Sequence, residues 1–267
     1  MCYDDGAQPP DPPAAGSTAQ GEDLVLTAED GNRFAACLAT PSQPMGAQVL
    51  IFPDIRGLHQ FYKDLALRFA EQGIAALALD YYGRTAGLTP RDDKFDHQPH
   101  VQQLRFDTFQ KDVATALAYL RSQEGGCVPT FTVGFCMGGS LSLLTGTRDL
   151  GLTGVIGFYP GQTRRFPGIG TVPEQAANIK YPVLGLFGGA DPSIPREHVE
   201  ALTLKLKAAC IENEIVLYPN APHSFFDRRA TEYAEASADA WRRVLQFIKE
   251  HSVPGERLEQ EEQEPGQ

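Results

Sequence analysis

Short apolar segments alternate with amphipathic segments through the middle of the chain. Residues 48–53 and 74–79 are almost continuously apolar, which is typical of strands buried on both faces of a parallel sheet. Between them, residues 58–69 repeat large apolar side chains at helical spacing. The pattern along the whole chain predicts strands at 22–27, 34–39, 48–53, 74–79, 130–135, 152–158, 182–187 and 214–218.

Amphipathic segments predict the helices that connect these strands. They lie around residues 58–69 and 109–120, directly after Cys136, and around 196–209 and 234–248. Strands that alternate with helices form right-handed crossovers, so we expect an α/β fold with a mostly parallel sheet and helices on both faces. In such sheets ligands bind at the carboxyl ends of the strands, so the loops there hold the candidate site.

The composition and charge of the 267-residue chain restrict its class. Hydrophobic residues make up 42% of it, which excludes a wholly disordered protein. The formal net charge of −11 argues against nucleic acid and anionic membrane as partners. No apolar stretch approaches the roughly 18 residues of a transmembrane helix, and the first residues lack the features of a signal peptide. We therefore expect a cytoplasmic protein.

Composition also divides the chain into three parts. Residues 1–20 are rich in Pro, Gly and Ala and hold almost no large apolar side chains, so we expect a flexible leader. Residues 21–254 carry the strand and helix pattern and are expected to form one domain. Residues 255–267 contain five Glu and one Arg, which predicts an acidic disordered tail.

The five cysteines are widely spaced along the chain. They form no CxxC pair and no zinc-ligand pattern, so no metal site is expected. An odd number of cysteines in a cytoplasmic chain indicates reduced thiols, and most free cysteines are inert buried residues. The five cysteines are Cys2, Cys37, Cys127, Cys136 and Cys210. The next step is to ask whether the sequence around any of them indicates a reactive thiol.

One cysteine lies in a glycine-rich turn between a predicted strand and a predicted helix. The segment Gly134-Phe135-Cys136-Met137-Gly138 has the form of the nucleophile elbow G-x-S-x-G, with Cys in place of Ser. Glycines are needed there because a Cβ would collide with the neighbouring strand or helix, and the helix N-terminus favours a thiolate. The alternative is a structural Cys beside a Gly-rich turn. The strand before it and the small-residue helix after it favour the nucleophile.

An acid and then a histidine follow in the chain order that this architecture requires. Asp191 comes directly after the predicted strand 182–187, and His223 lies in the loop after strand 214–218. His223 can take the thiol proton and later activate water, while Asp191 can hold the imidazole in the correct tautomer. Taken singly, Asp191 could be a turn residue and His223 a surface residue. Three matches in this order favour a Cys–His–Asp triad.

Acyl transfer also needs two N–H donors for the oxyanion of the tetrahedral intermediate. One is the backbone N–H of Met137, which follows the nucleophile. We assign the other to Ile55, in the loop after strand 48–53, which Gly57 would shape.

Six segments together carry a resemblance to a known family: 53–58, 80–84, 134–140, 157–160, 188–191 and 223–225. With them, the sequence resembles the dienelactone hydrolase family of the α/β-hydrolase fold over about residues 21–250. The resemblance implies Cys136 as nucleophile, Asp191 as the residue that orients the imidazole and His223 as base. It also implies hydrolysis of lactone or ester bonds without a metal or organic cofactor.

The same resemblance implies residues that contact the substrate. Arg84 would help to hold a substrate carboxylate, which suits a guanidinium, and a surface salt bridge is the alternative. Asp54 replaces the Glu that the family commonly has beside the nucleophile, and Asp227 stands where the family often has an Arg. Tyr159 and Arg228 are further residues expected to bind the substrate.

The leading hypothesis is a hydrolase that cleaves a small ester or lactone through an acyl-cysteine intermediate, as a monomer or homodimer. The nearest alternative is a carboxylesterase or thioesterase with a neutral substrate, which Asp227 favours and Arg84 opposes. A non-hydrolytic protein in which Cys136 senses oxidants is a third hypothesis. Residues 84–105 are long and polar enough to form a lid over the site.

Overall fold

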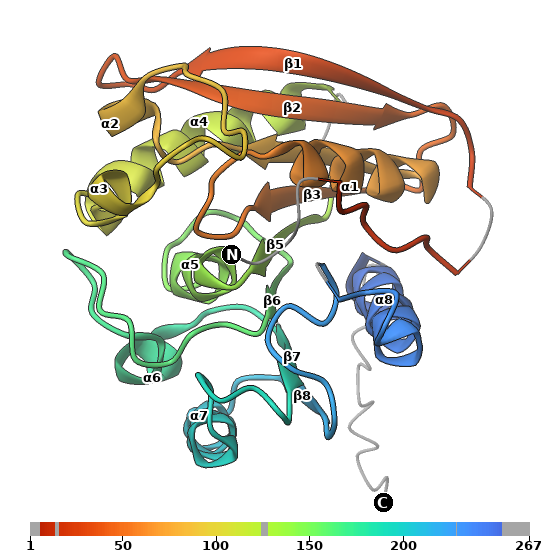
Figure 1. Cartoon of the computed structure of the whole chain (residues 1–267), viewed down its shortest axis with the longest axis vertical. Helices are drawn as coiled ribbons and strands as arrows, with labels where there is room; N and C mark the ends of the chain where they lie inside the picture. Colours follow the sequence, from red (N-terminus) through yellow and green to blue (C-terminus); the bar gives the residue numbers. More distant parts are fainter. Residues whose placement is uncertain (1–5, 14–15, 124–127, 228, 253–267) are drawn as a thin grey trace, which may run out of the picture.

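An eight-stranded sheet forms the centre of the computed structural model, which describes residues 6–13, 16–123, 128–227 and 229–252. The strand order is β1-β2-β4-β3-β5-β6-β7-β8 (Figure 1). β2 pairs antiparallel with both β1 and β4, and every other neighbouring pair is parallel. The strands are β1 (Ala19–Thr27), β2 (Arg33–Pro41), β3 (Ala47–Phe52), β4 (Ile74–Leu79), β5 (Thr130–Phe135), β6 (Gly154–Phe158), β7 (Val183–Gly188) and β8 (Asn213–Tyr218).

Burial explains which strands lie in the middle of the sheet. Every residue of β3, β4, β5, β6 and β7 is buried, as the continuously apolar sequences require. The edge strands β1 and β8 are partly exposed, and β1 carries polar residues at most of its exposed positions. The predicted α/β fold with a mostly parallel sheet is confirmed.

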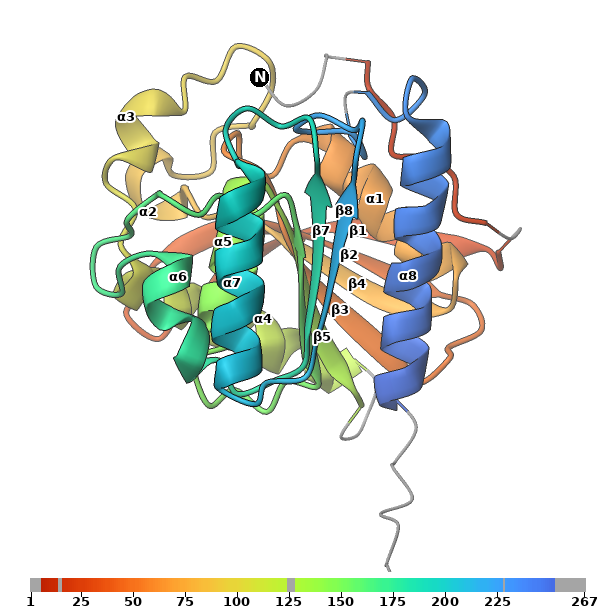
Figure 2. The same cartoon turned by 90° about the horizontal axis from the view of Figure 1, so that it is seen from below.

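Helices cover both faces of the sheet. Figure 2 shows α1 and α8 on one face and α5 and α7 on the other. No helix within the described ranges is long and apolar enough to cross a membrane. The helices are α1 (Gln60–Glu71), α2 (Gly83–Ala86), α3 (Gln98–Val101), α4 (Phe106–Gln123), α5 (Met137–Thr145), α6 (Val172–Gln175), α7 (Arg196–Ala208) and α8 (Ala234–Ser252), with a short 3-10 helix at Ala176–Asn178.

The described part of the segment before the sheet lies against the domain. The indole N–H of Trp241 on α8 donates to the carbonyl oxygen of Pro10 at 2.8 Å. The N–H of Ser17 donates to the carbonyl oxygen of Glu71 at 2.8 Å, at the end of α1. β1 begins at Ala19, so the last two residues of the expected leader 1–20 belong to the sheet.

The ends of the chain and the domain boundaries stay predictions. The expected acidic tail, 255–267, lies outside the described residues, as do Cys2, Cys127 and Arg228.

The loops at the carboxyl ends of the parallel strands meet at one edge of the sheet. Because β3 to β8 all run in the same direction, the loop that follows each of them begins at this edge. The predicted site residues in these loops include Asp54 after β3, Cys136 after β5, Tyr159 after β6, Asp191 after β7 and His223 after β8.

Candidate active site

Cys136 joins β5 to α5 in an unusual backbone conformation. Its φ is 54° and its ψ is −113°, a combination that residues with a Cβ rarely adopt. A Cβ on Gly134 would lie 2.0 Å from the carbonyl oxygen of Gly138, and a Cβ on Gly138 would lie 2.0 Å from that of Pro53. The glycines therefore let β5, α5 and the loop after β3 approach closely enough to hold Cys136 in this strained turn.

Replacing Gly138 with alanine is expected to lower the free energy of unfolding by about 1–3 kcal/mol. The new methyl group would meet the carbonyl oxygens of Pro53 and Phe52 at 2.0 and 2.2 Å, so the backbone must move. Urea unfolding measures the effect. Gly161→Ala is the matched control, because the atom nearest to its Cβ is the Ser140 hydroxyl oxygen at 3.6 Å. Equal stability of the two variants would contradict this account of the turn.

Location and access distinguish Cys136 from the other described cysteines. Its side chain is partly exposed at the carboxyl edge of the sheet. Cys37 is buried in β2, and burial raises the pKa of its thiol to about 11. Cys210 is exposed, but it precedes β8 and so lies at the opposite edge. Among these thiols, Cys136 is the one that a substrate at the carboxyl edge could reach.

Asp191 and His223 meet although 32 residues separate them in the chain. Nδ1 of His223 lies 2.6 Å from Oδ2 of Asp191. Oδ1 of Asp191 accepts hydrogen bonds from the N–H and hydroxyl of Ser193 at 2.8 and 2.6 Å. Burial acts to raise the pKa of Asp191, but the bonds from His223 and Ser193 outweigh it and hold this pKa below its usual range. The ionised carboxylate therefore fixes the tautomer that carries its proton on Nδ1.

Two buried tyrosines hold the loop that follows β3. The hydroxyl of Tyr81 donates to the carbonyl oxygens of Pro53 and Asp54, and the hydroxyl of Tyr82 donates to that of Ile55 at 2.6 Å. In a trans peptide the N–H points opposite to the C=O, so the bond to the Asp54 carbonyl turns the Ile55 N–H away from Tyr81. Tyr81 and Tyr82 are not among the predicted site residues. Their position close after the buried strand β4 is the sequence signal that could have identified them.

The two predicted oxyanion donors have unused N–H groups. The N–H of Ile55 and the N–H of Met137 make no hydrogen bond within the described ranges. Met137 begins α5, so its N–H is one of those that a helix leaves without an internal acceptor. Both groups are therefore available to an oxyanion at this edge, and their role stays a prediction.

Two fully buried carboxylates order the same loop. Oδ1 of Asp54 accepts the N–H of Arg56 at 2.9 Å, and Oδ1 of Asp80 accepts the N–H of Leu58 at 3.2 Å. Gly57 lies between these bonds with φ at 81°, and a Cβ there would lie 2.6 Å from Oδ1 of Asp80. Position 57 therefore requires a glycine, which is the residue expected to shape this loop. The effect of Asp54 on the nucleophile stays a prediction.

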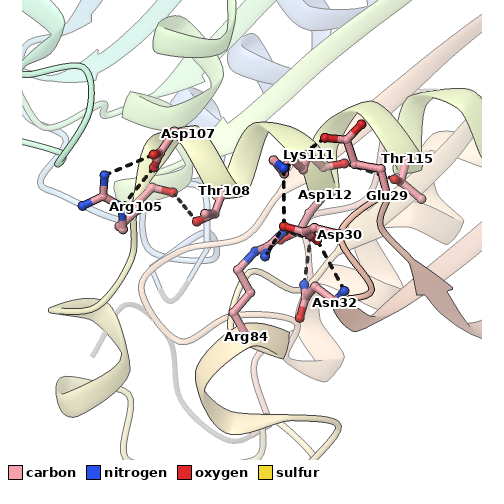
Figure 3. A network of polar contacts seen from close by, with 10 residues as sticks. All are labelled: Glu29, Asp30, Asn32, Arg84, Arg105, Asp107, Thr108, Lys111, Asp112 and Thr115. Carbon is pink, nitrogen blue, oxygen red and sulfur yellow. Dashed lines mark hydrogen bonds and ion pairs between the residues drawn. The ribbon is translucent and has the colours of Figure 1, made fainter.

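Arg84 does not reach the site with a free guanidinium. Its Nε and Nη2 bind the carboxylate of Asp112 at 3.0 and 2.8 Å, and its Nη1 and Nη2 bind that of Asp30 at 2.8 and 3.2 Å (Figure 3). Asp112 also accepts the side-chain amide of Asn32. The structure therefore shows the salt bridge that is the alternative for Arg84, whereas a contact between Arg84 and a substrate carboxylate stays a prediction.

Tyr159 is buried beside the imidazole of His223. The side chain is fully buried, its hydroxyl donates to Oδ2 of Asp227 at 2.7 Å, and its ring centroid lies 4.9 Å from that of His223. Tyr159 thus packs beside the imidazole, and its role as a substrate-binding residue stays a prediction. The other predicted residue in this region, Arg228, lies outside the described residues.

Segment 84–105 is fastened to the rest of the domain at its start, where Arg84 binds Asp112 and Asp30, and near its middle. Arg91 binds the buried carboxylate of Asp80, and Asp93 contacts Arg56 and lies 3.0 Å from Nε2 of His59. Movement of this segment as a lid stays a prediction.

The arrangement suits nucleophilic acyl transfer. It combines an accessible thiol in a strained turn, an imidazole held by an ionised carboxylate, and two unused N–H groups. Over the described ranges, no group of three or more His, Cys, Asp or Glu side chains could hold a metal ion. A nucleophile elbow on a mostly parallel sheet defines the α/β-hydrolase class.

Comparison with known proteins assigns a family within this class. The chain belongs to the dienelactone hydrolase family, whose sequence model matches residues 34–252. A protein of Yersinia pestis, provisionally named a carboxymethylenebutenolidase, is 32% identical over 234 residues, which cover 84% of this chain and 86% of that protein. A carboxymethylenebutenolidase of Pseudomonas putida is 26% identical over 235 residues, which cover 85% and 95%. The predicted family is confirmed, and the chain is a hydrolase that acts on ester bonds.

Solved structures agree with this fold. A protein of Klebsiella pneumoniae, provisionally described as a dienelactone hydrolase, has a TM-score of 0.77 and 25% identity, and the match covers 87% of this chain and 99% of that one. An esterase of Pyrococcus furiosus has a TM-score of 0.67 and 16% identity, with 92% and 99% covered. The second likeness supports the α/β-hydrolase fold alone.

Proposed function

We propose that the chain cleaves a small ester or lactone through an acyl-cysteine intermediate, with Cys136 as nucleophile, His223 as base and Asp191 as the orienting carboxylate. The observation that carries the proposal is the 2.6 Å contact between Nδ1 of His223 and Oδ2 of Asp191. It lies at the edge of the sheet that also carries the strained turn of Cys136. A base held in this tautomer can accept a thiol proton on Nε2.

The first half of the reaction acylates Cys136. Its thiol proton passes to Nε2 of His223, and the N-terminus of α5 favours the resulting thiolate. The sulfur attacks the carbonyl carbon, and the oxyanion that forms accepts hydrogen bonds from the N–H groups of Ile55 and Met137. Collapse of this intermediate re-forms the C=O bond and breaks the ester C–O bond, while His223 protonates the leaving alkoxide.

The second half releases the acid. His223 takes a proton from water as the water oxygen attacks the thioester carbon. The C–S bond then breaks, and the proton on His223 returns to the sulfur of Cys136. An ester yields an alcohol and a carboxylic acid, whereas a lactone yields one hydroxy acid. Every proton and electron pair is supplied by the substrate, water and these side chains, so no step needs a cofactor.

An acyl group on Cys136 is the direct test of this proposal. The protein is mixed with p-nitrophenyl acetate, quenched in acid during turnover and digested for peptide mass spectrometry. We expect an acetyl group on the peptide that contains Cys136. Steady release of p-nitrophenol with that peptide unmodified would contradict the proposal. Rapid consumption of peroxide by Cys136 without any ester turnover would support the oxidant-sensing alternative.

A neutral substrate is favoured over an anionic one by two contacts. The guanidinium of Arg84 is bound by two carboxylates, those of Asp112 and Asp30. Asp227 places a buried carboxylate at the position where the family often has an Arg. Neither position therefore offers a free cation to a substrate carboxylate, which supports a carboxylesterase or thioesterase with a neutral substrate.

Replacing Arg84 with methionine is expected to cost stability without changing substrate preference. The buried carboxylate of Asp112 loses its cation, which lowers the free energy of unfolding by about 1–3 kcal/mol. We expect kcat/KM for p-nitrophenyl acetate and for mono-p-nitrophenyl succinate to change by the same factor. Urea unfolding and steady-state kinetics measure the two effects. A loss confined to the anionic ester would instead assign Arg84 to the substrate carboxylate.

A further inference from the structure

A buried hydrogen bond connects the loop after β6 to the loop that carries His223. The hydroxyl of Tyr159 donates to Oδ2 of Asp227 at 2.7 Å, and both side chains are almost completely buried. A carboxylate out of water depends on donors that the protein fixes in place, and bonds to charged groups are stronger than those between neutral groups. This bond therefore fastens two loops that are 68 residues apart in sequence.

Tyr159 is itself held in a defined position. Its φ is 37°, in the left-handed region that residues other than glycine rarely adopt, and its N–H donates to the carbonyl oxygen of Leu186 on β7 at 2.7 Å. Its ring lies at 55° to the His223 ring, with 4.9 Å between centroids. The tyrosine ring therefore blocks one direction in which the imidazole could move.

The chain after His223 folds back so that Asp227 reaches Tyr159. Ser224 has a φ of 60°, and its carbonyl oxygen accepts the N–H of Asp227 at 3.3 Å. The resulting tight turn is fixed on one side by the bond between His223 and Asp191. On the other side it is fixed by the bond between Asp227 and Tyr159.

We propose that Tyr159 and Asp227 are positioning residues for His223 in the reaction proposed above, on which this inference rests. The bond to Asp191 fixes Nδ1 but leaves the imidazole able to tilt about that contact. The ring of Tyr159 limits the tilt, and Asp227 keeps Tyr159 in place. A displacement of about 1 Å at a reacting group can lower a rate by about 100-fold, so this support has a kinetic effect. Asp227 therefore helps to position the base, His223, through its hydrogen bond with Tyr159.

The test compares Tyr159→Phe with a matched control, Tyr218→Phe. The hydroxyl of Tyr218 also donates to a carboxylate, Oδ2 of Asp239 at 2.9 Å, and its ring packs on Phe225 at 5.0 Å between centroids. We expect Tyr159→Phe to lower kcat for p-nitrophenyl acetate by about tenfold and to change KM by less than about twofold. We expect Tyr218→Phe to leave both constants unchanged.

Variants of Asp227 and a spectroscopic signal give a second test. Asp227→Asn keeps an oxygen acceptor for Tyr159 and should retain most of kcat, whereas Asp227→Ala should lose about tenfold. The proton NMR signal of the Nδ1–H of His223, shifted downfield by its short bond to Asp191, reports on the imidazole without turnover. It should broaden in Tyr159→Phe and Asp227→Ala and stay sharp in Tyr218→Phe.

Wild-type kcat and an unchanged signal in Tyr159→Phe would overturn the proposal. So would losses of kcat in Tyr159→Phe and Tyr218→Phe that both follow a fall in Tm, because they would show a purely structural role. If the wild-type protein hydrolyses no ester, the proposed function fails separately. The NMR signal then still decides whether Tyr159 and Asp227 hold the imidazole of His223.

Discussion

Replacement of Cys136 by alanine is expected to lower kcat/KM for p-nitrophenyl acetate by about 10⁴-fold or more while the protein stays folded. Without the sulfur, no acyl group can be transferred to the protein. His223 and the N–H groups of Ile55 and Met137 could then only polarise the substrate and activate water. Release of p-nitrophenol measures the loss, and circular dichroism checks the fold.

Cys210→Ala is the control for loss of a thiol elsewhere in the chain. Cys210 is exposed but precedes β8, at the opposite edge of the sheet, so full activity is expected. Cys37 is unsuited to replace the nucleophile, because burial raises the pKa of its thiol to about 11 and keeps it protonated near neutral pH. Ester turnover that persists in Cys136→Ala would remove the basis of the acyl-cysteine mechanism.

The central sheet could be predicted because burial on both faces leaves a continuous apolar signal in the sequence. The predicted strands 74–79 and 130–135 coincide with β4 and β5. β1 begins at Ala19 instead of residue 22, because an edge strand can carry exposed polar residues that give no apolar signal. The helices α2, α3 and α6 have four residues each, too few for a helical period to be visible.

The candidate site could be predicted only where its signal is local or fixed by chain order. The turn around Cys136 is local, and Asp191 and His223 each follow a predicted strand. The partners of Arg84 could not be found in this way, because Asp112 and Asp30 lie 28 and 54 residues from it. No sequence period relates an Arg to carboxylates at such separations, so its ion pairs are known only from the folded chain.

Replacement of Arg91 by alanine is expected to lower the free energy of unfolding by about 3–5 kcal/mol, because it leaves a buried carboxylate without its cation. Nε and Nη2 of Arg91 bind the carboxylate of Asp80 at 2.9–3.2 Å, and both side chains are almost fully buried. Asp80 would lose its buried cation. Because Asp80 also accepts the N–H of Leu58, the loop that carries Ile55 would lose support and ester turnover would fall.

Urea unfolding of Arg91→Ala and Arg105→Ala at two pH values tests this expectation. Arg105 and Asp107 form an exposed pair (Figure 3), whose loss should cost only about 0–1 kcal/mol. Burial raises the pKa of Asp80, and loss of Arg91 raises it further. A carboxyl group whose pKa is higher in the folded state takes up a proton on folding, so the stability of Arg91→Ala falls as pH rises. The loss of unfolding free energy in Arg91→Ala, relative to the wild-type protein, should be larger at about pH 8 than at about pH 5. Equal losses of unfolding free energy in both variants, or a loss in Arg91→Ala that does not change with pH, would show that Arg91 does not stabilise the Asp80 carboxylate.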